Sequence, residues 1–241
     1  MSSNKNYTLD VYFDYVCSPS RAFVCLLEEN EIKFNIKEVL LIKEDNKKDF
    51  YKNNINEFCY LPGMVLNDDL NTQNFILYES SACMKFACRY FNLPENWYNS
   101  QNIKREALIN KYLDWQAGSS KKTLQANYFN EKVVNLFKKH GINKSKIASV
   151  DNPKEKLDEL MKYYNNIFSK QKFIIDNEIS IADLVFYSDL LTLILFEDSF
   201  DVKKYKHVDD YFSNRVGSLK GVGKVRSILI DKLKEYGFEL Q

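Results

Sequence analysis

Glycine, proline and histidine are scarce in this 241-residue chain, which contains 7 glycines, 4 prolines and 2 histidines. So few turn-forming residues make an all-β fold a poor candidate, because tight turns between strands depend on glycine and proline. The histidines, His140 and His207, lie far from the cysteines, and no two cysteines have the Cys-x-x-Cys spacing of a zinc site. The sequence therefore predicts no metal site.

A strong net charge and a long apolar run are also missing. The formal net charge is +1 at pH 7, so the chain has neither a basic field for nucleic acid nor an acidic tail. A membrane-spanning helix needs about 20 apolar residues, and the longest candidate, 184–196, is interrupted by Ser188 and Asp189. The first ten residues lack the apolar region of a signal peptide. We expect a cytoplasmic protein with no membrane span and no nucleic-acid partner.

What the sequence does contain is an alternation of strand and helix patterns over its first 91 residues. Strand patterns occupy 8–15, 33–40, 61–66 and 75–78, and helical patterns occupy 19–30, 43–54 and 79–91. The order β-α-β-α-β-β-α predicts an α/β layer. Ser18 is expected to be the N-cap of the first helix, with Pro19 at its first position.

Beyond Asn92 the strand patterns nearly disappear. A polar linker over 92–101 leads into helical patterns that continue to the end of the chain, and the Ser-x-x-Asp capping box at 180–183 begins the most apolar of them. We therefore predict two domains, an α/β domain of residues 1–91 and an all-helical domain of residues 92–241.

Six short motifs follow one another along this architecture. They read FDYVCSPSRA (13–22), LP (61–62), YESSA (78–82), LPENWY (93–98), YLDWQ (112–116) and SIADL (180–184). In this order and spacing the chain resembles the glutathione transferase superfamily, most of all its theta class, over nearly its whole length. The resemblance implies a thioredoxin-like domain that binds glutathione as co-substrate, and a helical domain that forms a pocket for a small hydrophobic electrophile. It also implies a homodimer with a role in detoxification.

The resemblance assigns glutathione-binding residues. A cis Pro62 would expose the backbone of Leu61 to the extended tripeptide by strand addition, and Glu79 with Ser80 would hold the γ-glutamyl end at a helix N-terminus. Asn46 and Lys47 lie where theta enzymes bind the glycine carboxylate, although asparagine replaces the usual histidine. The alternatives are a turn proline, a helix cap at Glu79 and Ser80, and a solvated loop at Asn46 and Lys47.

Three further residues are assigned to the electrophile pocket. Lys121 lies where a theta enzyme can carry an arginine near the sulfur site, and Trp115 and Gln116 lie on the same helical pattern. Gly118 stands where an aspartate is found in relatives, so the chemistry of this side departs from the family pattern. For Trp115 the alternative is a place in the core, which is the more usual one for aromatic residues at helical spacing.

Cys17 occupies the position of the serine that donates a hydrogen bond to the glutathione sulfur in theta enzymes. A thiol is a weaker donor than a hydroxyl, but a helix N-terminus favours a thiolate. Cys17 can therefore assist conjugation, or act as the nucleophile of a thiol transferase or dehydroascorbate reductase through a mixed disulfide. A shift of one residue would instead make Ser18 the donor, and an inert thiol is a further alternative. A non-catalytic binding or assembly module is the alternative of another class.

Overall fold

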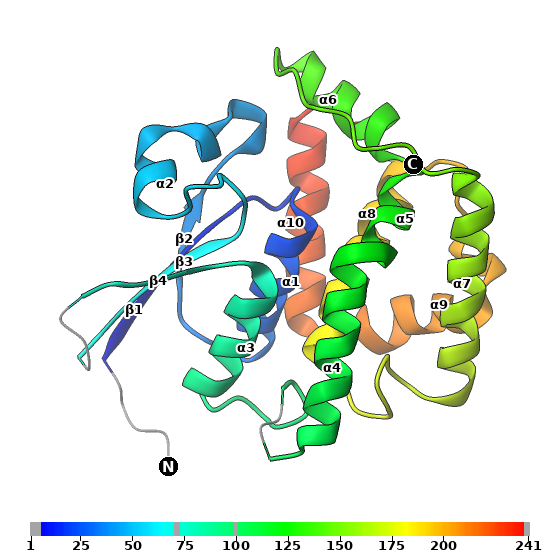
Figure 1. The fold of residues 1–241 in the computed structure, drawn as a ribbon, viewed down its shortest axis with the longest axis horizontal. Helices are drawn as coiled ribbons and strands as arrows, with labels where there is room; N and C mark the ends of the chain where they lie inside the picture. Colours follow the sequence, from blue (N-terminus) through cyan, green and yellow to red (C-terminus); the bar gives the residue numbers. More distant parts are fainter. Residues whose placement is uncertain (1–5, 70–72, 99–100, 239–241) are drawn as a thin grey trace.

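A mixed sheet forms one side of the structure, and helices form the rest (Figure 1). The computed structural model describes residues 6–69, 73–98 and 101–238. The four strands lie in the order β2-β1-β3-β4, and they are β1 (Tyr7–Phe13), β2 (Asn35–Glu38), β3 (Gly63–Asp68) and β4 (Phe75–Tyr78). Strand β1 is parallel to β2 and antiparallel to β3, so that Val11 pairs with Ile36 on one side and with Met64 on the other.

Three helices belong to this α/β part: α1 (Ser18–Glu29), α2 (Asp49–Asn54) and α3 (Ser80–Tyr90). Two short 3-10 turns, Leu41–Lys43 and Asp45–Lys47, precede α2. The observed order is therefore the predicted β-α-β-α-β-β-α, and the α/β class is confirmed. Alternate residues of β1, Leu9, Val11 and Phe13, are buried, as expected for a strand that turns one face to a core.

After β4 the described residues form no further strand. The remaining α-helices are α4 (Ile103–Trp115), α5 (Lys121–Gln125), α6 (Val134–Lys139), α7 (Pro153–Lys170), α8 (Ile181–Phe196), α9 (Lys206–Asp210) and α10 (Lys220–Glu235). A π-helical turn, Gln116–Ser120, lies between α4 and α5. None of the helices in the described ranges is both long enough and apolar enough to cross a membrane.

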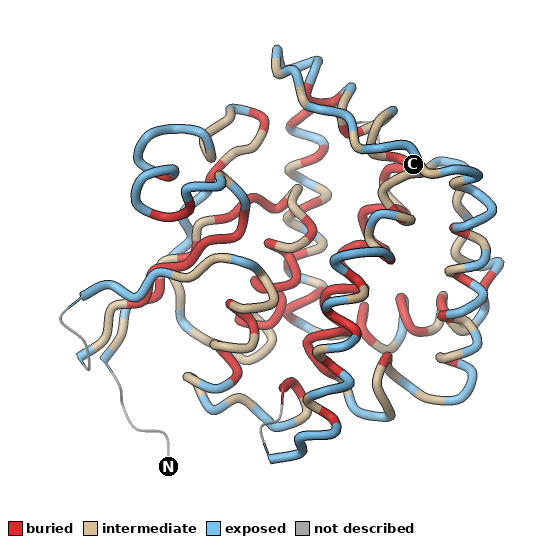
Figure 2. Tube along the Cα trace, in the orientation of Figure 1, coloured by how far each residue is buried: buried red, intermediate tan, exposed pale blue. Residues whose placement is uncertain are grey.

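Helices α1 and α8 join the two parts of the structure. Helix α1 packs against α8, α10 and α3, and buried residues run along β1, α1 and α8 (Figure 2). The predicted capping box at the start of α8 is confirmed, because the Ser180 amide donates to Asp183 Oδ2 over 2.8 Å. The start of α1 therefore meets a helix that is buried along most of its length, and that junction positions the candidate site.

Candidate functional site

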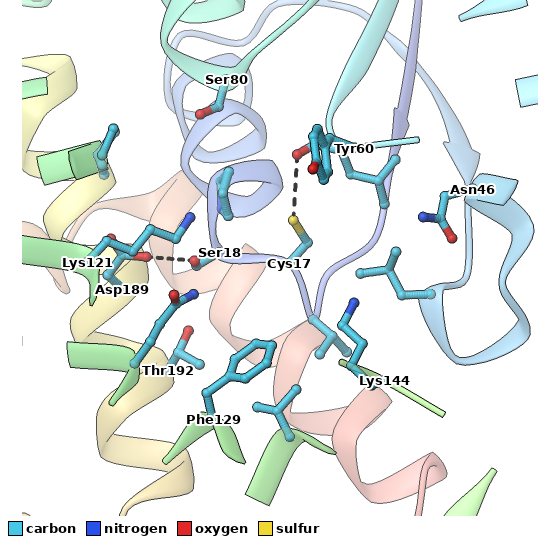
Figure 3. Close-up of a pocket in the computed structure, with 18 of the residues that line it drawn as sticks. Cys17, Ser18, Asn46, Tyr60, Ser80, Lys121, Phe129, Lys144, Asp189 and Thr192 are labelled. Carbon is cyan, nitrogen blue, oxygen red and sulfur yellow. Dashed lines mark hydrogen bonds between the residues drawn. The ribbon is translucent and has the colours of Figure 1, made fainter. Parts of the chain in front are cut away.

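A cavity of about 620 Å³ opens between the α/β part and the helices (Figure 3). One wall consists of the start of α1, the turns before α2, the segment 58–61 and the start of α3. The opposite wall comes from the π-helical turn after α4, from α5 and α8, and from the chain around α6. Nearly all residues of the second wall are remote in sequence from those of the first, so that the cavity exists only in the folded chain.

Cys17 lies at the mouth of α1, between strand and helix. The turn before it is held by Asp14, whose carboxylate accepts hydrogen bonds from the amides of Val16 (2.9 Å) and Leu41 (2.8 Å). Burial raises the pKa of Asp14, and these two hydrogen bonds act in the lowering direction. The Cys17 thiol donates to the Leu61 carbonyl over 3.7 Å (Figure 3), and both residues line the cavity. The thiol therefore lies beside the Leu61 carbonyl at the cavity.

Ser18 is not the N-cap that the sequence predicts. Cys17 occupies that position, and Ser18 is the first residue of α1. The Ser18 hydroxyl instead donates to Asp189 Oδ1 of α8 over 2.6 Å, and Gln116 donates to the other oxygen of the same carboxylate. The reason is the packing of α8 against α1, which places a buried carboxylate within reach, and charged acceptors form stronger hydrogen bonds than neutral groups. The hydroxyl proton of Ser18 is thus used in a hydrogen bond to Asp189 and does not point to the cavity opening beside Cys17.

Arg21 is the buried cation of this junction, with an exposed fraction of 1%. Its guanidinium donates to the carbonyls of Tyr15 (2.7 Å), Val16 (3.0 Å) and Ser188 (2.7 Å), and to the Thr192 hydroxyl. Burial lowers the pKa of Arg21, whereas its interactions with Cys17 and Asp189 raise it. Arg21 therefore ties α1 to α8 and balances the buried charge of Asp189.

The residues assigned to glutathione lie on one wall, except for Pro62, which does not line the cavity. Leu61, Glu79, Ser80, Asn46 and Lys47 all line the cavity, and the Leu61-Pro62 peptide is cis, as predicted. Glu79 precedes α3 with a φ of 71°, and its side chain makes no capping hydrogen bond.

The polar loop on this wall is partly engaged with its own neighbours. Asn46 donates to the Cys59 carbonyl over 2.7 Å, and Lys47 pairs with Glu44. The side chain of Glu79, in contrast, forms no hydrogen bond or ion pair within the described residues, so that a helix cap does not explain it.

Only some of the residues assigned to the electrophile pocket line the cavity. Gln116 and Lys121 line the cavity, but Trp115 does not. The indole packs edge-on against Tyr112 of α4 and Tyr163 of α7, at centroid distances of 5.8 Å and 5.7 Å. The expectation that Trp115 faces the pocket is therefore corrected, because neighbouring positions of a helix point in different directions and Gln116 takes the inward one.

Several lining residues were not assigned from the sequence, among them Asp189, Thr192, Lys144, Cys59, Phe129 and Phe137. For one of them, Asp189, the sequence does contain a signal. Asp189 interrupts the most apolar segment of the chain, and a charged residue there must be paired or face a cavity. For Lys144 the sequence contains no such signal, because this residue lies in a polar stretch without helical or strand periodicity.

The fold and cavity define a two-part protein in which a thioredoxin-like layer is closed by helices. A family model described as glutathione S-transferase, C-terminal domain, matches residues 124–218. Similar proteins include glutathione S-transferase theta-1 of Gallus gallus, 27% identical over 79% of this chain and 78% of the relative. Glutathione S-transferase theta-1 of Homo sapiens is 25% identical over 76% and 72% of the two chains.

Solved structures agree in fold. The apo form of human glutathione S-transferase T1-1 superposes with a TM-score of 0.74 at 21% identity, over 96% of this chain and 92% of the other. Human glutathione transferase theta-2, in complex with glutathione and an unknown ligand, gives a TM-score of 0.74 at 22% identity, over 95% and 90%. The family model, these relatives and the solved structures together support a theta-like assignment within the glutathione transferase superfamily.

Proposed function

We propose that this protein is a glutathione transferase that conjugates the glutathione thiolate to small hydrophobic electrophiles. One observation carries the proposal. Cys17, the Leu61 backbone and the Glu79–Ser80 helix start line the same cavity, and apolar side chains of the helical part line its other wall. The theta-class relatives support conjugation over the two alternatives, a thiol transferase and a non-catalytic module.

Glutathione would lie along the wall of the α/β part. Its cysteinyl backbone would pair with Leu61, as an added strand pairs with an exposed edge. Its γ-glutamyl carboxylate would bind at the start of α3 through Ser80, where backbone amides and the helix dipole favour an anion. Glu79 would take the ammonium, and Asn46 and Lys47 would bind the glycine end.

The reaction itself needs a thiolate, because the thiol of a free cysteine is mostly protonated at neutral pH. The thiol proton leaves to solvent, the sulfur forms a bond to the electrophilic carbon, and a leaving group departs with its electron pair. We assign the sulfur contact to Cys17, since the Ser18 hydroxyl donates to Asp189. The electrophile would rest on lining residues such as Phe129, Phe137 and Phe196.

The variant Cys17→Ser tests this assignment. A hydroxyl donates a stronger hydrogen bond than a thiol, so glutathione conjugation should be retained or rise, while any glutathione-dependent disulfide reduction should disappear. Both rates are measured on the same preparation, with calorimetry for glutathione binding. Unchanged rates in both assays would show that Cys17 is not at the sulfur site. A wild-type chain that binds no glutathione at millimolar concentration would instead favour the non-catalytic module.

The organisation of the protein is part of the same proposal. Residues 1–91 would bind glutathione and residues 92–241 would supply most of the electrophile pocket, in a cytoplasmic homodimer that serves detoxification without a metal. The superfamily supports the dimer. Light scattering tests it, because a dimer has twice the 28.4 kDa mass of the chain.

A further inference from the structure

Lys144 reaches the cavity from a segment without regular secondary structure that follows α6. Its amide donates to the Ile142 carbonyl over 3.1 Å, which holds the turn. Its ammonium lies over the ring of Phe137, 4.8 Å from the centroid, and Figure 3 shows it pointing into the cavity on the side of Cys17. The side chain is therefore anchored by an aromatic ring that lines the same cavity.

The ammonium of Lys144 lacks a carboxylate partner. Within residues 6–69, 73–98 and 101–238, no ion pair or side-chain hydrogen bond involves it, whereas Lys47 at the same cavity pairs with Glu44. Burial lowers the pKa of Lys144, which is the cost of holding an ammonium away from water without an anion. An anion bound beside it would remove part of that cost.

The charged and titratable groups that face Lys144 identify where the anion would lie. After burial, the largest influence on its pKa is Cys17 in the raising direction, followed by Lys47 in the lowering direction and by Glu44 and Asp14 in the raising direction. The remaining charged groups that line the cavity are Glu79, Lys121 and Asp189. Lys144 and Cys17 line the same cavity, where the Lys144 side chain points to the side of Cys17 (Figure 3), the residue that we place at the glutathione sulfur.

We propose that Lys144 is a further catalytic residue, whose ammonium contacts the sulfur of bound glutathione and stabilises its thiolate. The inference rests on the proposed function. When the thiol releases its proton to solvent, the negative charge forms beside a cation that has no other partner. An opposite charge at contact distance lowers the pKa of an acid by about one to three units. Lys144 would therefore enlarge the fraction of glutathione that is bound as thiolate at neutral pH.

The experiment compares Lys144→Met with the wild-type protein. We expect the midpoint of the pH profile of kcat/KM, and of the thiolate ultraviolet absorbance of the glutathione complex, to rise by about one unit or more. Below the midpoint, kcat/KM should fall about tenfold for each unit of that rise. Lys144→Arg keeps the charge and should return the midpoint close to the wild-type value. Should Lys144→Met fold poorly by circular dichroism, Lys144→Gln serves as the second uncharged variant.

Lys146→Met is the matched control, because Lys146 is exposed on the same segment and does not line the cavity. Its pH midpoint should stay at the wild-type value. A higher KM for glutathione with an unmoved midpoint in Lys144→Met would overturn the inference, since Lys144 would then only bind a carboxylate. So would a midpoint that moves in Lys121→Met and not in Lys144→Met. Glutathione binding and conjugation by the wild-type protein are measured first. If the wild-type protein shows neither, the proposed function fails and the inference about Lys144 fails with it. If it shows both, the results for Lys144→Met test the inference alone.

Discussion

The substitution Ser18→Ala separates the two candidates for the sulfur contact. It removes the hydroxyl that donates to Asp189 over 2.6 Å, at a position whose exposed fraction is 8%. Asp189 keeps its hydrogen bond from Gln116, so the carboxylate loses one of the two side-chain donors that it has among the described residues. A hydrogen bond to a charged group contributes about 1.5–3 kcal/mol, and we expect the free energy of unfolding to fall by about that amount.

Urea denaturation measures this loss, with Ser20→Ala as the control. Ser20 lies in the first turn of the same helix and is buried, but its hydroxyl has no hydrogen-bond partner among the described residues. Removing an unsatisfied hydroxyl costs little and can stabilise, so Ser20→Ala should leave the free energy of unfolding unchanged or raise it. The difference between the two variants isolates the bond to Asp189 from the effect of a buried alanine.

Activity gives the refuting result. If the Ser18 hydroxyl donates to Asp189 and not to glutathione, its loss affects stability and not the reaction. At a temperature where Ser18→Ala is folded, its kcat/KM for glutathione should then fall by about fivefold or less. Removing a donor from a developing charge costs about a hundredfold or more. A loss of that size, with the free energy of unfolding unchanged, would show that Ser18 is the sulfur donor and that the reasoning is wrong.

Two predictions concern the frame around the site. Gly221→Ala should lower the free energy of unfolding by about 1–3 kcal/mol in urea denaturation, because a Cβ at this position would lie 2.5 Å from the Glu29 amide nitrogen. Gly223→Ala is the control. A Cβ at Gly223 would meet nothing within 4 Å, so this variant should be slightly more stable than the wild-type protein. Burial raises the pKa of Asp183 to about 6. Between about pH 4 and 6 the folded chain therefore keeps a proton on Asp183 that the unfolded chain has released. Because of this difference, Asp183 makes the free energy of unfolding decrease as pH rises from about 4 to 6. Urea denaturation across that range should show this decrease in the wild-type chain and not in Asp183→Asn; equal slopes would contradict the assignment.

The sequence predicted the order of the elements because those signals are local. Residues 75–78 form β4 as expected, and the capping box at Ser180 and Asp183 forms as expected. Both depend on side chains within a few residues of one another, which periodicity and spacing record directly.

The site was less predictable because its side chains meet over long separations. Ser18 has the local preference of an N-cap, but Asp189, 171 residues away, takes its hydroxyl. Trp115 belongs to a family motif, yet it packs on α7 instead of lining the cavity. Lys144 lies in a segment whose polar composition indicates only solvent exposure, and its place in the cavity follows from how that segment packs in three dimensions.

The most direct test of the central claim is a crystal structure of the wild-type protein with glutathione bound. We predict that Cys17 Sγ lies within hydrogen-bonding reach of the glutathione sulfur, that the tripeptide pairs with the Leu61 backbone, and that Ser18 still donates to Asp189. A complex in which the Ser18 hydroxyl has left Asp189 and contacts the sulfur, with Cys17 turned away, would contradict the account.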